Sequence, residues 1–415
     1  PRSAYLARRD MKGAYATPGL IDTHAHLTLG PIEFVREPAP ALAVKYDDAY
    51  TEHAARMLLA YGVTTIRNPA GDAKINLAYK KAEALGEIDG PEAVTAGPVI
   101  DRSPIPFFGL SDLVDASHQI ESIVNAQADL GVDYIKLYHS LTEEDVARGV
   151  AAAHARGLPA IGHLSISWKK AADFGIDALV HAMPSSADDL EPAMRETYRS
   201  TARPGAFAFF EWWEAADLDG PVMRDVIKAL AEKQVHVDLT LIAFKLAFWG
   251  DDLAVRDEFL SLSHPDLIEN WRTFFRFDLG WSADDYARAK AVWPKILKFA
   301  RQLHDAGVPL TLGTDQANPF VAPGASLVQE MKLHREAGIS GWAVLRLATC
   351  DAARILRLGD ETGSLKPGLD ADVVFVAENP ALNLDTFLAP VLVLNNGRVF
   401  DPDALRAAAP SPAGR

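Results

Sequence analysis

Two histidines separated by one residue, His24 and His26, follow a short apolar run that begins after Pro18 and Gly19. Side-chain direction repeats every second residue along a strand, so both imidazoles should project to the same face. Neutral imidazole is a common metal ligand, but it is also an ordinary polar core group. The pair alone therefore leaves metal binding and a structural role open.

Four further residues that can bind metal or move protons stand at the ends of predicted strands. Each has an ordinary explanation by itself: a lysine paired with a carboxylate, a hydrogen-bonded core histidine, or an aspartate that caps a helix. Because the carboxyl ends of parallel strands would meet at one rim, the residues together favour a shared site. The four are Lys136, His163, His181 and Asp315.

Short apolar or β-branched runs alternate with amphipathic helical stretches over residues 18–358, which predicts a (β/α)8 TIM barrel. A doubly wound open sheet is the alternative, but no Gly-x-Gly-x-x-Gly turn follows an early strand. Helices are predicted at 47–61, 142–156, 221–233 and 283–306, where capping residues and terminal glycines mark their ends. The eight predicted strands are 19–23, 63–67, 92–96, 134–138, 159–163, 178–181, 236–240 and 309–313.

The two ends of the chain lack the strand–helix alternation of the middle. Residues 362–376 read as a turn followed by a strand, and 391–400 as a hairpin around the Asn396-Gly397 pair. We expect residues 1–17 and 359–415 to form a small β-sandwich domain beside a barrel of residues 18–358.

Composition narrows the function classes. The 415 residues carry a formal net charge of −15, which argues against nucleic acid as a partner. No apolar run approaches the roughly 18 residues that span a bilayer, so no membrane partner is expected. Cys350 is the single cysteine, so no internal disulfide can form. We expect a small molecule as the substrate. The expected location is the cytoplasm, or the periplasm or the extracellular space if an N-terminal segment has been removed. The composition also allows a homo-oligomer.

Six segments carry more specific motifs: 18–26, 59–67, 135–138, 162–163, 312–315 and 363–372. On these segments the sequence resembles the amidohydrolase superfamily, in particular its imidazolonepropionase-like and prolidase-like metal-dependent hydrolases. The resemblance implies that Lys136 carries carbon dioxide as a carbamate and bridges two divalent metal ions. Imidazole and carboxylate ligands favour zinc. The implied ligands are His24, His26 and Asp315 for the more buried ion, and His163 and His181 for the other.

The resemblance also implies a mechanism. A hydroxide shared by the two ions would attack an amide carbonyl, with Asp315 as general base and then general acid. Tyr138 lies two residues after Lys136 on the same face of the strand, and would stabilise the tetrahedral oxyanion. Packing inside the barrel is its alternative role.

Substrate contacts are harder to assign. Dipeptidases of this superfamily often carry a Gly-Gly-His-Gly segment after strand three, which is missing here. Arg102 and Arg67 are candidates to bind a substrate carboxylate, since guanidinium binds carboxylates bidentately. A surface or structural ion pair is the alternative for both. Phe320 is the candidate contact for an apolar part of the substrate.

The leading function is a binuclear metal-dependent hydrolase that cleaves an amide bond in a dipeptide, an N-acyl amino acid or a related carboxamide. One alternative is a mononuclear cyclic-amide hydrolase or deaminase in which Lys136 is not carboxylated. The other is a catalytically silent barrel that acts in binding.

Overall fold

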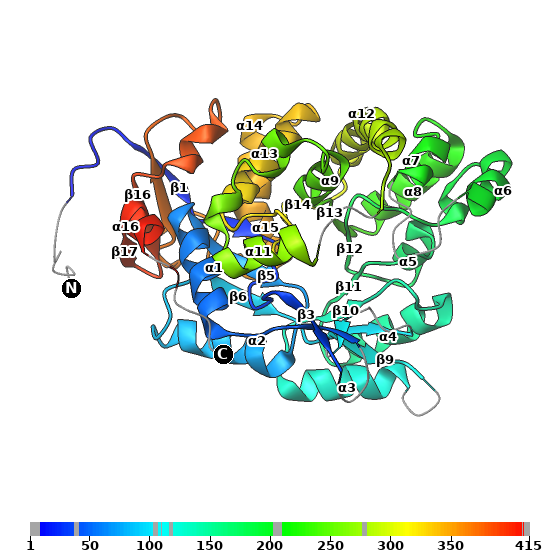
Figure 1. The fold of residues 1–415 in the computed structure, drawn as a ribbon, viewed down its shortest axis with the longest axis horizontal. Helices are drawn as coiled ribbons and strands as arrows, with labels where there is room; N and C mark the ends of the chain where they lie inside the picture. Colours follow the sequence, from blue (N-terminus) through cyan, green and yellow to red (C-terminus); the bar gives the residue numbers. More distant parts are fainter. Residues whose placement is uncertain are drawn as a thin grey trace.

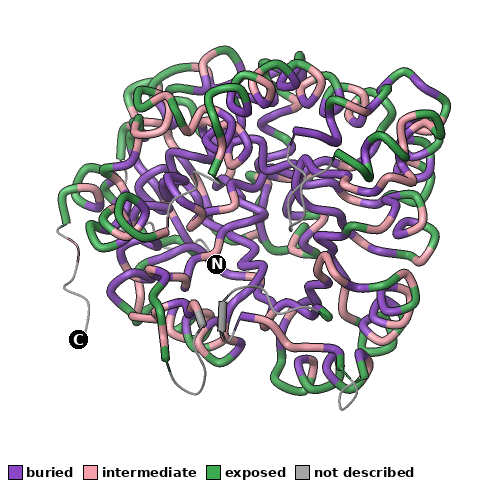
Figure 2. The backbone as a smooth tube through the Cα atoms, turned by 45° about the vertical axis from the view of Figure 1, so that its right-hand side comes forward, coloured by how far each residue is buried: buried purple, intermediate pink, exposed green. Residues whose placement is uncertain are grey.

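The computed structural model describes residues 9–36, 41–102, 107–108, 110–115, 119–201, 210–275, 280–408 and 410 (Figure 1). Strands form the centre of this α/β fold and helices surround them (Figure 1). Figure 2 shows the same division by burial, with buried backbone at the centre and exposed backbone mainly on the outer helices and loops.

The largest sheet has seven strands, and every neighbouring pair within it is parallel. Parallel strands place all their carboxyl ends at one edge, which is where the predicted site residues stand. Their order is β14 (Leu310–Thr311), β13 (His236–Asp238), β12 (Ala178–Val180), β11 (Ala160–Gly162), β10 (Ile135–Leu137), β7 (Val99–Asp101) and β9 (Ser111–Leu113).

A second parallel sheet comprises β2 (Leu20–Asp22), β5 (Val63–Asn68) and β6 (Glu92–Thr95). Backbone hydrogen bonds connect it to the larger sheet on both sides. Thr23 N donates to Leu312 O at 2.9 Å after β2 and β14, and Asp133 N donates to Thr95 O at 2.8 Å beside β6. This continuity is consistent with a (β/α)8 barrel.

All eight predicted strands are confirmed, and the bounds of each agree with the prediction to within two residues at either end. The sequence did not predict β7, which follows β6 after Gly97 and Pro98. Proline has no amide hydrogen to donate to a strand ladder, so strand three is interrupted there. Its first part pairs with β5 and its second part with β10.

The predicted helices are confirmed as α1 (Asp48–Ala60), α4 (Glu143–Ala155), α8 (Pro221–Glu232) and α12 (Ala283–Asp305). A capping box begins each of α4 and α12. The side chains of Thr142 and Ser282 accept hydrogen bonds from the backbone amides of Asp145 and Asp285, respectively. The carboxylates of these two aspartates accept hydrogen bonds from the backbone amides of Thr142 and Ser282 in return. The helices are α1 (Asp48–Ala60), α2 (Ala73–Ala84), α3 (Ile120–Leu130), α4 (Glu143–Ala155), α5 (Trp168–Asp173), α6 (Pro192–Thr201), α7 (Glu211–Ala215), α8 (Pro221–Glu232), α9 (Leu241–Phe248), α10 (Leu253–Arg256), α11 (Pro265–Thr273), α12 (Ala283–Asp305), α13 (Ala325–Glu336), α14 (Gly341–Leu347), α15 (Cys350–Ile355) and α16 (Pro402–Ala407). Short 3-10 turns occur at Ala187–Asp189, Leu260–Leu262 and Leu384–Leu388.

The N- and C-terminal segments form one antiparallel sheet, seen at the left of Figure 1. Its strands are β1 (Tyr15–Pro18), β15 (Val373–Val376), β16 (Leu392–Asn395) and β17 (Arg398–Phe400). The predicted sandwich is not confirmed, because these segments contribute this single sheet within the described residues. The division into two domains stays a prediction.

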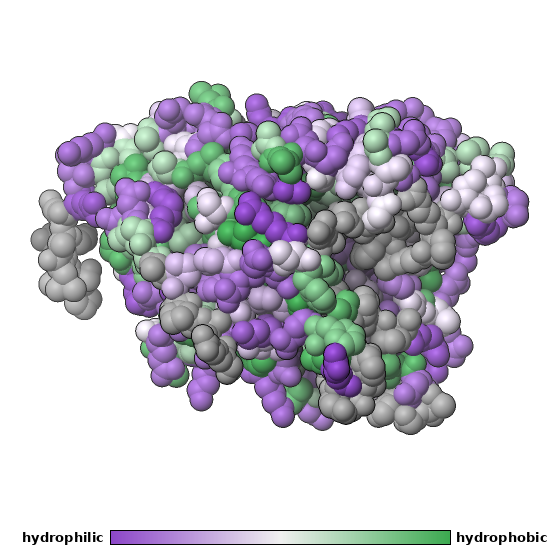
Figure 3. Space-filling model, viewed as in Figure 1, coloured by the Kyte–Doolittle hydropathy of each residue, from purple (hydrophilic) through white to green (hydrophobic). Residues whose placement is uncertain are grey.

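A three-stranded sheet of β3 (Ile32–Val35), β4 (Ala41–Val44) and β8 (Phe107–Phe108) follows the histidine pair in the chain. On the face shown in Figure 3, small apolar groups are scattered among hydrophilic side chains. Within the described ranges, no helix combines the length and apolarity that crossing a membrane requires.

Candidate metal centre

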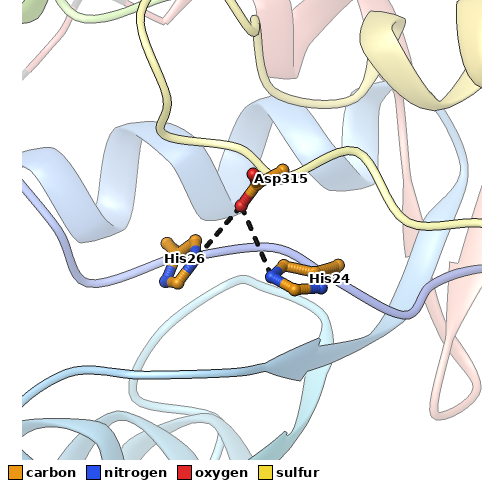
Figure 4. Close-up of side chains that lie close together, drawn as sticks. All are labelled: His24, His26 and Asp315. Atoms are coloured by element: carbon orange, nitrogen blue, oxygen red, sulfur yellow. Dashed lines mark ion pairs between the residues drawn. The ribbon is translucent and has the colours of Figure 1, made fainter. Parts of the chain in front are cut away.

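His24 and His26 lie directly after β2, and Asp315 lies after β14 on the neighbouring strand. The two segments are joined by the backbone: Asp315 N donates to His24 O at 2.7 Å, and His26 N donates to Gln316 O. Both imidazoles turn their Nε2 atoms toward one carboxylate oxygen of Asp315, at 3.4 Å from His24 and 3.2 Å from His26 (Figure 4). One ligand atom from each residue lies within 4.8 Å of the others, a spacing that could hold a metal ion.

Asp22 links the two ligand-bearing segments by hydrogen bonds. Its carboxylate accepts hydrogen bonds from His24 N at 3.1 Å, from Thr314 N at 3.0 Å and from Thr314 Oγ1 at 2.7 Å. Burial raises the pKa of Asp22 to about 7 despite these donors. The sequence motif contained Asp22, but it gave no sign that the side chain would join the two ligand-bearing segments.

Gly313 is required by the close packing at the same place. A Cβ atom there would lie 2.4 Å from His24 Cβ and 2.4 Å from Asp238 Oδ2. Both neighbours are buried, so neither can move away freely.

His163 and His181 extend the cluster to four imidazoles. Ring centroids are 5.4 Å apart for His26 and His24, 4.7 Å for His24 and His181, and 4.7 Å for His181 and His163. His181 Nδ1 is also 3.7 Å from Asp315 Oδ2. The structure thus brings together all four histidines and the aspartate that the sequence placed at one rim.

Two members of the cluster have unusual backbone conformations. His181 and Asp315 have φ angles of 72° and 62°, in the left-handed region that residues with a Cβ rarely adopt. Such strain persists only where surrounding contacts hold it, and it is concentrated at functional sites.

Lys136 lies on β10 with only 2% of its surface exposed. Among the described residues its Nζ atom has no hydrogen-bond partner. Burial, and then the positive charge of Arg67, lower the pKa of Lys136 to about 7. An uncharged amine is therefore accessible near neutral pH.

The buried histidines are held neutral in the same way. Burial, and then the charge of Lys136, lower the pKa of His24 and His163 well below the usual value. For His181, burial and then His163 have this effect. Neutral imidazoles keep a lone pair for a metal ion, so this donor set fits zinc or another divalent transition metal.

Tyr138 borders the cluster, with its ring centroid 4.7 Å from that of His163. Burial and the negative charges of Asp315 and Asp101 raise the pKa of its phenol. Tyr138 therefore remains protonated and can donate a hydrogen bond.

The predicted substrate contacts all have partners within the protein. Arg67 is buried and its Nε donates to Thr23 O at 2.7 Å. Arg102 forms a bidentate ion pair with Asp145, in which Nη2 lies 2.6 Å from Oδ1. Substrate binding by the two arginines stays a prediction.

Phe320 is also packed inside the protein, with 7% of its surface exposed. Its ring centroid lies 6.0 Å from that of Trp271, and the Arg256 guanidinium carbon lies 4.6 Å from the Phe320 ring centroid. Its contact with substrate stays a prediction.

Sequence reasoning missed Asp238 and Thr240 at the end of strand seven. Asp238 Oδ2 accepts a hydrogen bond from Thr23 Oγ1 at 2.7 Å and lies 3.9 Å from His24 Nδ1. Thr240 Oγ1 lies 2.9 Å from His181 Nδ1. Their positions two residues apart in the predicted strand 236–240 were the available signal, because such residues share a face.

Comparisons with known proteins identify the family of this chain. Residues 15–400 match the amidohydrolase family. An ochratoxinase of Aspergillus niger is 30% identical over 128 residues, which cover 29% of this chain and 25% of the relative. The match thus spans about a quarter of that relative's length.

Two solved structures illustrate the shared fold. A bottromycin amidohydrolase superimposes with a TM-score of 0.68 at 23% identity, covering 94% of this chain and 78% of the other. A Xaa-Pro dipeptidase with bound methionine gives a TM-score of 0.64 at 18% identity, with coverage of 96% and 91%. The chain belongs to the amidohydrolase family.

Proposed function

We propose that this protein is a binuclear amidohydrolase that cleaves an amide bond in a small molecule. The observation that carries the proposal is the convergence of four imidazoles and Asp315 near the buried amine of Lys136, which has no hydrogen-bond partner in the described part of the chain. A purely structural role would not explain why the amine is buried without a hydrogen bond among the described residues, because burying such a polar group costs free energy.

The ligand set divides between two ions. His24, His26 and Asp315 would hold one ion, and His163 and His181 the other. Bound divalent ions would lower the pKa of a water molecule and polarise the carbonyl of the substrate.

Lys136 would connect the two halves of the site as a carbamate. Its neutral amine would attack carbon dioxide, forming a nitrogen–carbon bond and releasing one proton to solvent. The product is an anion with two oxygen donors, which suits a position between two cations. The pKa near 7 supports this step, because only the uncharged amine is nucleophilic.

Asp315 and Tyr138 would handle the remaining chemistry. The Asp315 carboxylate would accept the proton of the attacking water and return it to the leaving amine. The Tyr138 phenol would donate a hydrogen bond to the oxyanion that forms from the carbonyl. Both groups adjoin the histidine cluster.

The names of two structural neighbours support a substrate class. The dipeptidase and the bottromycin amidohydrolase are named for amide cleavage, so we propose a dipeptide, an N-acyl amino acid or a related carboxamide.

The test combines metal analysis with a substrate panel. Protein purified without chelator should carry two divalent ions per chain, and the zinc-loaded protein should hydrolyse members of a panel of dipeptides, N-acyl amino acids, lactones and carbamates. Lys136→Ala should lose metal and activity, whereas Lys228→Ala, with its side chain 69% exposed, should change neither. One ion per chain and unchanged activity in Lys136→Ala would instead identify a mononuclear cyclic-amide hydrolase or deaminase.

A further inference from the structure

Thr240 occupies the N-cap position of α9 but does not cap that helix. Threonine at an N-cap usually accepts a hydrogen bond from the second or third amide of the first turn. Here Thr240 makes no such bond, and its φ and ψ angles of 45° and 47° are left-handed. Its hydroxyl instead lies 2.9 Å from His181 Nδ1.

Glu330, on a different helix, takes over the capping function. Glu330 lies on α13, which packs against α9 (Figure 1). Its Oε2 accepts a hydrogen bond from Ile242 N at 2.7 Å, and the backbone of Leu241 also interacts with the carboxyl. The first amides of α9 are therefore satisfied without the Thr240 side chain.

The Glu330 side chain is fully buried beside His334. Both Glu330 and His334 have 0% of their surface exposed. His334 Nδ1 is 3.0 Å from Glu330 O and 3.3 Å from Glu330 Oε1. Burial raises the pKa of Glu330 well above its usual value, so a glutamine is a close substitute for the side chain.

We propose that Glu330 is a positioning residue for His181: by capping α9 from α13, it leaves the Thr240 hydroxyl to fix the His181 imidazole. In this proposal Thr240 Oγ1 accepts a hydrogen bond from His181 Nδ1–H, which leaves the lone pair on Nε2. Hydrogen bonds to the second ring nitrogen generally orient metal-binding histidines. This inference rests on the proposed metal site.

Four variants form two matched pairs. Thr240→Val and Glu330→Met remove the acceptor atoms but preserve side-chain size, whereas Thr240→Ser and Glu330→Gln retain an acceptor. Loss of such second-layer bonds typically costs 10- to 100-fold in metal affinity. We therefore expect Thr240→Val and Glu330→Met to bind zinc about 10- to 100-fold more weakly in competition with a chromogenic chelator. The serine and glutamine variants should stay close to wild type.

A second measurement separates positioning from general stability. In metal-free protein labelled with ¹⁵N-histidine, His181 should be the Nδ1–H tautomer in wild type, Thr240→Ser and Glu330→Gln. It should become a tautomer mixture in Thr240→Val and Glu330→Met. If Glu330→Met does not fold, Glu330→Asp shortens the same side chain and should show the same effects. Wild-type zinc affinity and an unchanged His181 tautomer in a folded Glu330→Met or Glu330→Asp would overturn the inference.

The two proposals fail in different ways. Absence of zinc binding by the wild-type protein would refute the metal site, while the tautomer measurement on metal-free protein would still test the connection from Glu330 to His181. If Thr240→Val weakens zinc binding and Glu330→Met does not, the metal site stands and Glu330 has no part in positioning His181.

Discussion

Replacing Lys136 by methionine should change how the stability of the metal-free protein depends on pH. The pKa of Lys136 is lowered from its ordinary 10.5 to about 7, mainly by burial. Between these values the unfolded chain carries a proton on the amine and the folded chain does not. The unfolded state therefore binds more protons, so this amine makes stability rise with pH across the window.

The size of the effect follows from the two pKa values. Each pKa unit corresponds to about 1.36 kcal/mol. Between about pH 8 and about pH 10, wild type should gain roughly 2 to 3 kcal/mol of unfolding free energy more than Lys136→Met does. Below about pH 7 the amine is protonated in both states, and the difference should level off.

Urea unfolding of chelator-treated protein in carbon-dioxide-free buffer measures this difference. Lys228→Met is the control, because the Lys228 side chain is 69% exposed and should follow the wild-type profile. Parallel stability profiles for wild type and Lys136→Met would refute the assignment of Lys136 as a buried neutral amine.

Two further predictions concern residues around the site. Gly313→Ala should lower the unfolding free energy by about 1 to 3 kcal/mol through overpacking and weaken zinc binding, while Gly359→Ala, where a methyl group meets only ordinary contacts at 3.5 Å or more, should do neither. A wild-type denaturation midpoint and zinc affinity in Gly313→Ala would contradict the packing described here. Arg102→Gln should leave KM unchanged and cost at most about 1 kcal/mol of stability, because the side chain is 43% exposed and pairs with Asp145. A rise in KM of tenfold or more would instead support Arg102 as a substrate contact.

Much of the fold could be predicted from the order of apolar runs. The eight expected strands are present because each is a short apolar segment bounded by turn-forming residues, a local property of the chain. The β7 strand was missed because Pro98 divides strand three, and the choice of partner on each side of that break depends on neighbours distant in sequence.

Part of the candidate site could also be predicted from the sequence, and part could not. His24, His26, His163, His181 and Asp315 could be found because strand ends in parallel order converge. The environment of Arg67 could not be predicted from the sequence. Its burial and its hydrogen bonds to Thr23 and Asp238 exist only because strands one, two and seven meet in the folded protein.

The sequence by itself determined which chemical groups stand at the strand ends, because residue type and a two-residue period are local properties. Only the tertiary structure decided the protonation states and the contacts of these groups. Burial removes water from Lys136 and the imidazoles, and contacts between distant segments allow Glu330 to cap α9 and Asp22 to join the ligand-bearing strands. Those effects depend on which surfaces meet in space, which no local pattern records.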